Sequence, residues 1–96
     1  MTRENLLAIL RQFKRDYADK YGILEMGIFG STARDEAGED SDVDIWIKTE
    51  TPNPFTLVHV KEDIEGLTVK QVDIVRVRDK MNPFLRERIE REGRDV

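Results

Sequence analysis

Apolar residues recur at helical spacing near the start of the chain and predict an amphipathic helix there. Thr2 can cap this helix at its N-terminus, and Gly22 ends it at about Tyr21. Its apolar side consists of Leu6, Leu7, Ile9, Leu10, Phe13 and Tyr17, with charged residues outside this stripe. We therefore expect the helix to cover a hydrophobic core.

Three later apolar segments have the length and composition of β-strands. They cover residues 23–29, 43–48 and 67–77. A short helix is expected at 31–34, a long helix at 55–64 that Gly66 stops, and a last helix at 83–91 that Gly93 ends. This order of elements predicts an α/β fold, in which a small mixed β-sheet has helices packed mainly on one face.

Length and charge limit the classes of protein that the chain can represent. Its 96 residues suit one domain spanning residues 1–96. The formal net charge of −4 argues against direct nucleic-acid binding, which relies on a basic face. The chain has no cysteine, which excludes disulfides and thiolate metal sites. No apolar run approaches the roughly 20 residues of a membrane span, and no signal-peptide pattern is present, so a cytoplasmic location is expected.

The stretch from Gly30 to Asp44 concentrates the candidate chemistry. Asp42 and Asp44 alternate with apolar residues at the head of a strand, so both should project from one face, with Cα atoms roughly 6–7 Å apart. Two carboxylates on one face repel each other unless they are protonated or bridged by a cation, and hard oxygen ligands favour Mg²⁺. Gly30 would let phosphate oxygens approach the backbone, and Ser31 offers a hydroxyl and an N–H near a helix start.

Residues in the Gly-Ser turn also have purely structural interpretations. Gly30 and Ser31, taken alone, would usually form an ordinary strand-to-helix turn. Arg34 could bind a phosphate, or it could pair with the neighbouring Asp35 or Glu36, as surface charges often do. Both interpretations of Arg34 stay open from the sequence.

Three residues on the later elements need separate consideration. Trp46 shares the face of the two aspartates by alternation; it could border a nucleotide pocket, although a packing role is the usual one for tryptophan. Asp73 interrupts an apolar strand, where a carboxylate is costly unless it is solvated, paired with Arg76 or Lys70, or bound to a cation. His59 is the only histidine, which excludes a histidine metal cluster and favours a surface or packing role.

The spacing Gly-Ser, ten residues, then Asp-x-Asp resembles the signature of the nucleotidyltransferase superfamily related to DNA polymerase beta. The short length and the GSTAR run from Gly30 to Arg34 resemble its minimal nucleotidyltransferase (MNT) branch. The resemblance covers about Leu6 to Gly93 and implies the nucleotidyltransferase fold. It also implies that Asp73 is the third metal-binding aspartate, because that residue of the family lies on a strand in a similar apolar run.

The resemblance implies a Mg²⁺-dependent transfer of a nucleoside monophosphate group. Asp42 and Asp44 would hold two Mg²⁺ ions roughly 3.5–4 Å apart. Asp73 would complete the ligand set of one ion and could take the proton of the attacking hydroxyl. Gly30 and Ser31, together with Arg34, would bind the phosphates of the nucleotide.

The resemblance also implies a partner. MNT proteins are commonly encoded beside HEPN-domain proteins and act as antitoxins, transferring AMP from ATP to a hydroxyl, typically of tyrosine, on a HEPN ribonuclease toxin. The chain has no room for the acceptor domain of antibiotic nucleotidyltransferases, so we expect the acceptor on another protein or on a second subunit, and a homo-oligomer is possible. Two alternatives stay open: a non-catalytic antitoxin that neutralises by binding, and a nucleotidyltransferase that acts on a small molecule such as an aminoglycoside.

Overall fold

A computed structural model describes residues 2–34 and 42–96. In chain order, its elements are α1 (Arg3–Tyr21), β1 (Ile23–Ile28), α2 (Gly30–Ala33), β2 (Val43–Thr49), α3 (Pro54–Thr68), β3 (Val72–Arg76), α4 (Pro83–Glu92) and β4 (Arg94–Asp95). The strands form one sheet in the order β3-β2-β1-β4, in which β2 and β3 are parallel and the other pairs are antiparallel. The predicted α/β fold with a small mixed sheet is confirmed.

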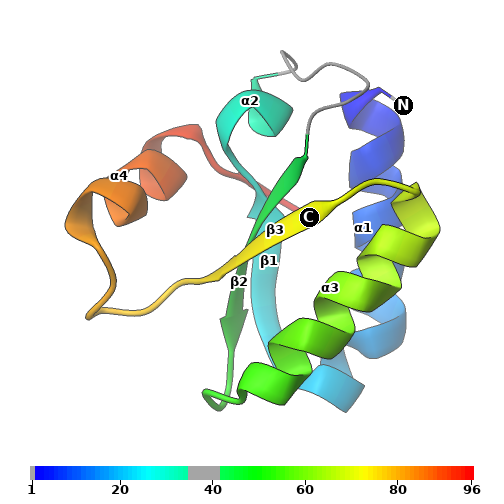
Figure 1. Ribbon diagram of the computed structural model, residues 1–96, viewed down its shortest axis with the longest axis horizontal. Helices are drawn as coiled ribbons and strands as arrows, with labels where there is room; N and C mark the ends of the chain where they lie inside the picture. Colours follow the sequence, from blue (N-terminus) through cyan, green and yellow to red (C-terminus); the bar gives the residue numbers. More distant parts are fainter. Residues whose placement is uncertain (1, 35–41) are drawn as a thin grey trace.

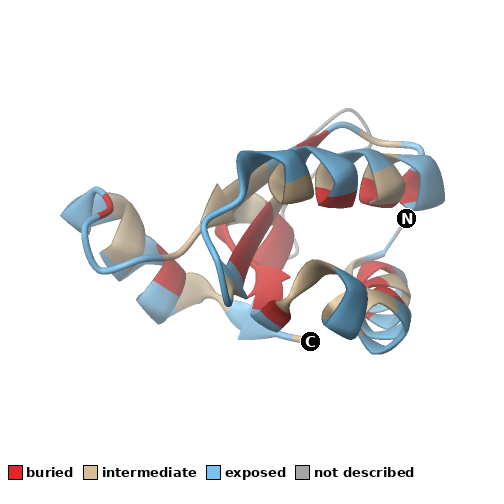
Figure 2. Ribbon diagram, turned by 90° about the horizontal axis from the view of Figure 1, so that it is seen from below, coloured by how far each residue is buried: buried red, intermediate tan, exposed pale blue. Residues whose placement is uncertain are grey.

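The main hydrophobic core lies between one face of the sheet and the two long helices. α1 and α3 pack against each other and against this face (Figure 1). Strand alternation sends Met26 and Ile28 of β1, and Ile45 and Ile47 of β2, into the same core, where all four are fully buried. Figure 2 shows the buried strands between helices whose outer surfaces are exposed. Burial of these strand and helix residues is the main force that holds the layers together.

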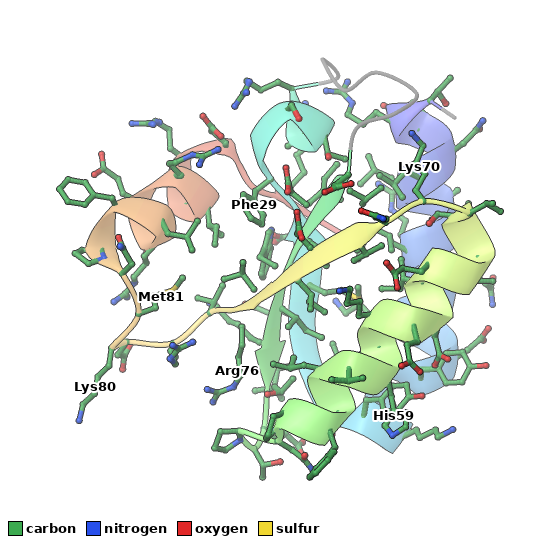
Figure 3. All side chains as sticks on the ribbon, viewed as in Figure 1. Phe29, His59, Lys70, Arg76, Lys80 and Met81 are labelled. Carbon is green, nitrogen blue, oxygen red and sulfur yellow. The ribbon has the colours of Figure 1, made fainter. Side chains whose placement is uncertain are left out.

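A second, smaller cluster lies on the opposite face of the sheet, beneath α4. It consists of Phe29, Trp46, Met81 and Ile89, with Val75, Val77 and Leu85 packed around them. Trp46 is only 5% exposed, which confirms the packing role expected for it. Phe29 and Met81 are labelled in Figure 3 on the side of the sheet that faces α4. The helices therefore lie mainly on one face, with α4 set apart on the other.

The first helix follows its sequence signals closely. The Thr2 hydroxyl accepts a hydrogen bond from the Asn5 amide at 3.1 Å, and Gly22 ends the helix in the left-handed conformation at φ 65°. The predicted bounds of this helix are confirmed. They could be predicted from the sequence because the caps and the apolar stripe are both local features. Among the described residues, no helix is long and apolar enough to cross a membrane.

The predicted end of the second long helix is wrong. Gly66 was expected to stop it, but α3 continues to Thr68 and ends at Val69, which has a left-handed φ of 56°. Thr68 is buried one turn after Ile64, and its hydroxyl donates to the Ile64 carbonyl at 2.9 Å. Packing of this buried face outweighs the modest helix penalty of a glycine, which is about 1 kcal/mol.

Two strand predictions also need correction. The third strand was expected over 67–77, but β3 spans only Val72–Arg76, because its first residues belong to the end of α3 and the following turn. β4 was not predicted at all. It has two residues, Arg94 and Asp95, which pair with β1. Two charged residues are too short a segment to show the alternation that predicts a strand.

A hydrogen bond between the two long helices gives a testable pH dependence. Tyr21 donates to Asp63 at 2.7 Å, and this bond, with a smaller contribution from burial, raises the pKa of Tyr21 from 10.0 to about 12. Because the folded pKa is the higher one, the stabilisation is complete below pH 10 and is lost as the pH rises from 10 to about 12.

Tyr21→Phe is therefore expected to lower the free energy of unfolding by about 1 kcal/mol at neutral pH. Denaturant unfolding at a series of pH values should show this difference shrinking above pH 10. Tyr17→Phe is the matched control, because it removes the hydroxyl of the neighbouring ring in the same aromatic stack and keeps the Tyr21–Asp63 bond. A difference that does not change with pH would contradict the assignment.

Candidate active site

The structure brings two of the three predicted aspartates to neighbouring positions. Asp44 on β2 lies in register with Asp73 on the parallel strand β3. Asp42 immediately precedes β2, and its negative charge acts on the Asp44 carboxyl. Asp44 is half-buried, whereas Asp42 and Asp73 are exposed. The three carboxylates thus line one end of the sheet face on which α4 packs.

Asp44 is the electrostatic centre of this group. Burial is the largest cause that raises the pKa of its carboxyl, and the negative charges of Asp73 and Asp42 raise it further. The positive charges of Arg88 and Arg34 act in the opposite direction. The ionised form of the Asp44 carboxyl is therefore disfavoured by burial and by the neighbouring negative charges. A bound cation would stabilise this ionised form.

The main chain of Asp44 is fixed on both sides by the β1–α2 turn. The Phe29 amide donates to the Asp44 carbonyl at 3.1 Å, and the Asp44 amide donates to the Thr32 hydroxyl at 3.3 Å. Thr32 is only 5% exposed, so this bond is shielded from water. Sequence analysis did not single out Thr32, whose role depends on the meeting of α2 and β2.

Gly30 is required by both conformation and space. Its φ of 66° is in the left-handed region, and a Cβ at this position would lie 2.8 Å from Asp44 Oδ2. Any side chain here would therefore push the carboxylate away. Ser31 follows in the first turn of α2 and is half-buried. The structure thus places the predicted Gly-Ser pair directly beside Asp44.

Arg34 makes an ion pair that sequence analysis did not consider. Its Nη1 lies 2.9 Å from Glu92 Oε2 on α4, while its proposed partners Asp35 and Glu36 lie outside the described residues. Arg88 Nη2 lies 4.0 Å from the same Glu92 oxygen. The Arg34–Glu92 contact could not be predicted from residue spacing, because α2 and α4 meet only through the fold, whereas Arg88 and Glu92 have the spacing of one helical turn.

The carboxylates do not form a closed metal site by themselves. Among residues 2–34 and 42–96, no three His, Asp or Glu side chains are grouped closely enough to hold a metal ion. Mg²⁺ is usually bound through one or two carboxylates and completed by waters and substrate phosphates, so a preformed cage is not required. The oxygen donors of Asp42, Asp44 and Asp73 fit such a cation when it arrives with a phosphate. The disfavoured negative charge of Asp44 would also be stabilised by the cation.

Two further residues are placed away from this centre. His59 is exposed near the start of α3, at the far end of the molecule from α2 (Figure 3), which confirms its predicted surface role. Trp46 borders a cavity of about 590 Å³ between α4 and the sheet, together with residues such as Arg76 and Ile89. The three aspartates are not among the residues that line this cavity.

Residues 10–96 match the family model of the nucleotidyltransferase domain. The chain belongs to this family. A protein from Thermococcus cleftensis named protein adenylyltransferase MntA is 38% identical over 76 residues, which cover 78% of this chain and 77% of that protein. A Methanocaldococcus jannaschii protein with the provisional name protein adenylyltransferase is 32% identical over 90 residues, covering 93% and 92% of the two chains. The family resemblance inferred from the Gly-Ser and Asp-x-Asp motifs is therefore confirmed.

Solved structures of nucleotidyltransferases share the fold. One protein, provisionally named a minimal nucleotidyltransferase, has a TM-score of 0.81 and 33% identity, covering all of this chain and 97% of its own. An MNT antitoxin in complex with a tri-AMPylated HEPN toxin of Shewanella oneidensis has a TM-score of 0.72 and 16% identity, covering 97% and 70%. A toxin–antitoxin structure with AMP-PNP has a TM-score of 0.74 and 18% identity, covering 90% and 68%. At such low identities, the last two establish the fold alone.

Proposed function

We propose that this nucleotidyltransferase transfers AMP from ATP to a side-chain hydroxyl, typically of tyrosine, on a HEPN-domain toxin in the cytoplasm, and so acts as its antitoxin. The observation that carries the transferase chemistry is the register pair of Asp44 and Asp73 beside the close approach of Gly30. The nature of the acceptor is supported by the names of similar proteins: a protein adenylyltransferase, and an MNT antitoxin bound to an AMPylated HEPN toxin.

Each predicted site residue has a role in this proposal. Asp42, Asp44 and Asp73 would hold Mg²⁺, which when bound would offset the negative charge of the phosphates and of the leaving group. Gly30 leaves room for phosphate oxygens next to the backbone, and Ser31 and Arg34 donate hydrogen bonds to them. Asp44 is anchored through its main chain, so its carboxylate can hold its position when these ligands arrive.

The proposed step balances in atoms and charge. The acceptor hydroxyl oxygen forms a bond to the α-phosphorus of ATP, and the bond from this phosphorus to the bridging oxygen of the β-phosphate breaks. Pyrophosphate leaves with that oxygen. The hydroxyl proton passes to a carboxylate, for which we propose Asp73, because it is exposed and a group on another protein can reach it.

The proposal is tested with labelled ATP, Mg²⁺ and the HEPN-domain protein encoded beside this chain, with intact mass spectrometry of the partner as the readout. We expect a covalent AMP adduct. Ser31→Ala should slow its formation by roughly 10–100-fold, because one or two hydrogen bonds to charged oxygens are lost. Asp73→Asn should slow it more, since both a metal ligand and a base are removed. A partner that stays unmodified, yet is neutralised equally by the wild type and Asp73→Asn, would leave only the non-catalytic binding alternative.

A further inference from the structure

The position of α4 is set by packing and not by its charged residues. Ile89 is buried against Trp46 in the cluster beneath the helix, and Leu85, one turn earlier, packs against the same cluster. After Gly93 the chain continues directly into β4, which pairs with β1 and ties the end of the helix to the sheet. The packing of α4 and the pairing of β4 therefore fix where the side chains on the α2 side of α4 lie relative to the candidate active site.

Arg88 is one of these side chains. Its Nη2 lies 3.5 Å from the point that a Cβ on Gly30 would occupy, and Asp44 Oδ2 lies 2.8 Å from the same point. The guanidinium and the carboxylate thus both border the small space above Gly30 that the proposal assigns to phosphate oxygens. The charge of Arg88 also acts on Asp44, because it lowers the pKa of that carboxyl against the larger effect of burial.

Glu92 connects Arg88 with Arg34. One oxygen, Oε2, lies 2.9 Å from Arg34 Nη1 and 4.0 Å from Arg88 Nη2. The Glu92 side chain is only 19% exposed, so water screens these contacts less than it would on an open surface. A single carboxylate therefore lies between the guanidinium group of Arg34, at the end of α2, and that of Arg88 on α4.

The Arg88–Glu92 contact differs from the other charged pairs of the helix. Arg86 and Glu90 approach to 3.2 Å, and Arg91 and Glu87 to 3.5 Å, at the spacing of one helical turn. Arg88 and Glu92 have that spacing too, yet they stay 4.0 Å apart, because Glu92 makes its shorter contact across to α2. Arg88 is thus paired less closely with its neighbour on the helix than the other arginines of α4 are.

We infer that α4 supplies Arg88 as a further phosphate-binding residue, which contacts the β- or γ-phosphate of the nucleoside triphosphate, and Glu92 as a positioning residue that orients Arg88 and Arg34. This inference rests on the proposed function. A guanidinium presents several N–H donors in a planar fork that matches phosphate oxygens, and it keeps its charge at all working pH values. When the triphosphate arrives, Arg88 exchanges its loose contact with Glu92 for phosphate oxygens and lies beside the metal-binding carboxylates.

Titration calorimetry with AMP-PNP and Mg²⁺ tests the role of Arg88. We expect Arg88→Gln to raise the Kd for AMP-PNP at least tenfold, and Arg88→Lys to restore part of the affinity. The matched control is Arg91→Gln, which makes the same change in net charge on the same helix, at a residue that pairs with Glu87. The Kd for AMP, measured by competition, should change less than twofold, since AMP lacks the β- and γ-phosphates.

Glu92→Gln gives a test that depends on the sign of the effect. If Glu92 acted only through its charge, removing a negative group near the phosphates would tighten AMP-PNP binding. If it positions the two arginines, its loss should weaken binding severalfold and raise the KM of ATP more than it lowers kcat. Thermal melts of all variants should remain close to that of the wild type, because these side chains contribute little burial.

The outcomes separate the inference from the proposed function. A wild-type protein that binds no AMP-PNP with Mg²⁺ would overturn both. Wild-type binding together with an Arg88→Gln affinity equal to that of Arg91→Gln would overturn the role of Arg88 alone. Equal losses for AMP and AMP-PNP would also overturn it, because Arg88 would then act elsewhere than on the terminal phosphates. Tighter binding by Glu92→Gln would remove the positioning role of Glu92.

Discussion

Replacing Asp44 by asparagine is expected to slow AMP transfer about a thousandfold or more without weakening the fold. The carboxylate lies in register with Asp73 and borders the space above Gly30, where the proposal places the metal and the phosphates. A bound metal stabilises developing charge by several kcal/mol, and about 4 kcal/mol corresponds to a thousandfold change in rate. An amide keeps the size of the side chain and removes the charge that holds the cation.

The fold should tolerate this change because ionised Asp44 is disfavoured where it lies. Burial, Asp73 and Asp42 together raise the pKa of Asp44 despite the attraction of Arg88 and Arg34. The bonds that fix residue 44 involve its main chain, which asparagine retains. The midpoint of thermal unfolding should therefore be equal to that of the wild type or higher.

Asp79→Asn is the matched control for this experiment. It makes the same chemical change at a side chain that is 99% exposed. The ion pair of Asp79 with Arg86 is long, at 3.8 Å, so its loss should matter little. It should leave both the transfer rate and the melting midpoint unchanged. Near wild-type transfer by Asp44→Asn would show that this carboxylate is not part of the active site, and a marked loss of stability would show that its charge is needed for folding.

Gly27→Ala is expected to be strongly destabilising, although it adds one methyl group. Gly27 lies in β1 between two register partners, Trp46 on β2 and Asp95 on β4. A Cβ here would overlap the carbonyl oxygen of Arg94 and lie 2.7 Å from Trp46 Nε1. A backbone atom cannot move aside as a flexible side chain can, so β4 must separate from β1 or the indole must leave its place.

The expected cost is about 2–3 kcal/mol, in the range of overpacked cores. Trp46 Nε1 is buried and has no hydrogen-bond partner among the described residues, so packing alone holds this ring. Displacement of the ring and of β4 should shift α4 and with it Arg88, so the affinity for AMP-PNP should fall as well. Trp46 is the only tryptophan, and a red shift of its fluorescence emission would report its exposure.

Gly66→Ala is the matched control, and it should have the opposite sign. Gly66 lies inside α3, and a Cβ there would meet nothing within 4 Å. Alanine should therefore stabilise the helix by about 0.5–1 kcal/mol. Denaturant unfolding of both variants measures the two effects on one scale. Equal stability of Gly27→Ala and the wild type would contradict the tight packing of β1, β4 and Trp46.

Sequence alone determined the features that depend on neighbouring residues. Thr2 and Gly22 set the limits of α1, because helix caps act within a few residues. Alternation along β2 placed Asp44 and Trp46 on one face of the sheet and Val43, Ile45 and Ile47 on the other. The Gly-Ser and Asp-x-Asp motifs were sufficient to indicate the nucleotidyltransferase family, since the residues of both motifs lie close together along the chain.

Only the tertiary structure decided the features that depend on contacts between distant segments. α3 passes Gly66 because Ile64 and Thr68 are buried against the core, a gain that no local propensity reports. β4 exists only because β1 offers it an edge. Arg34 and Glu92 are 58 positions apart, and they meet because Ile89 packs on Trp46 and so sets α4 beside α2. The free energy that places these charges comes from apolar burial elsewhere in the molecule, so the pattern of charges along the chain carries no trace of it.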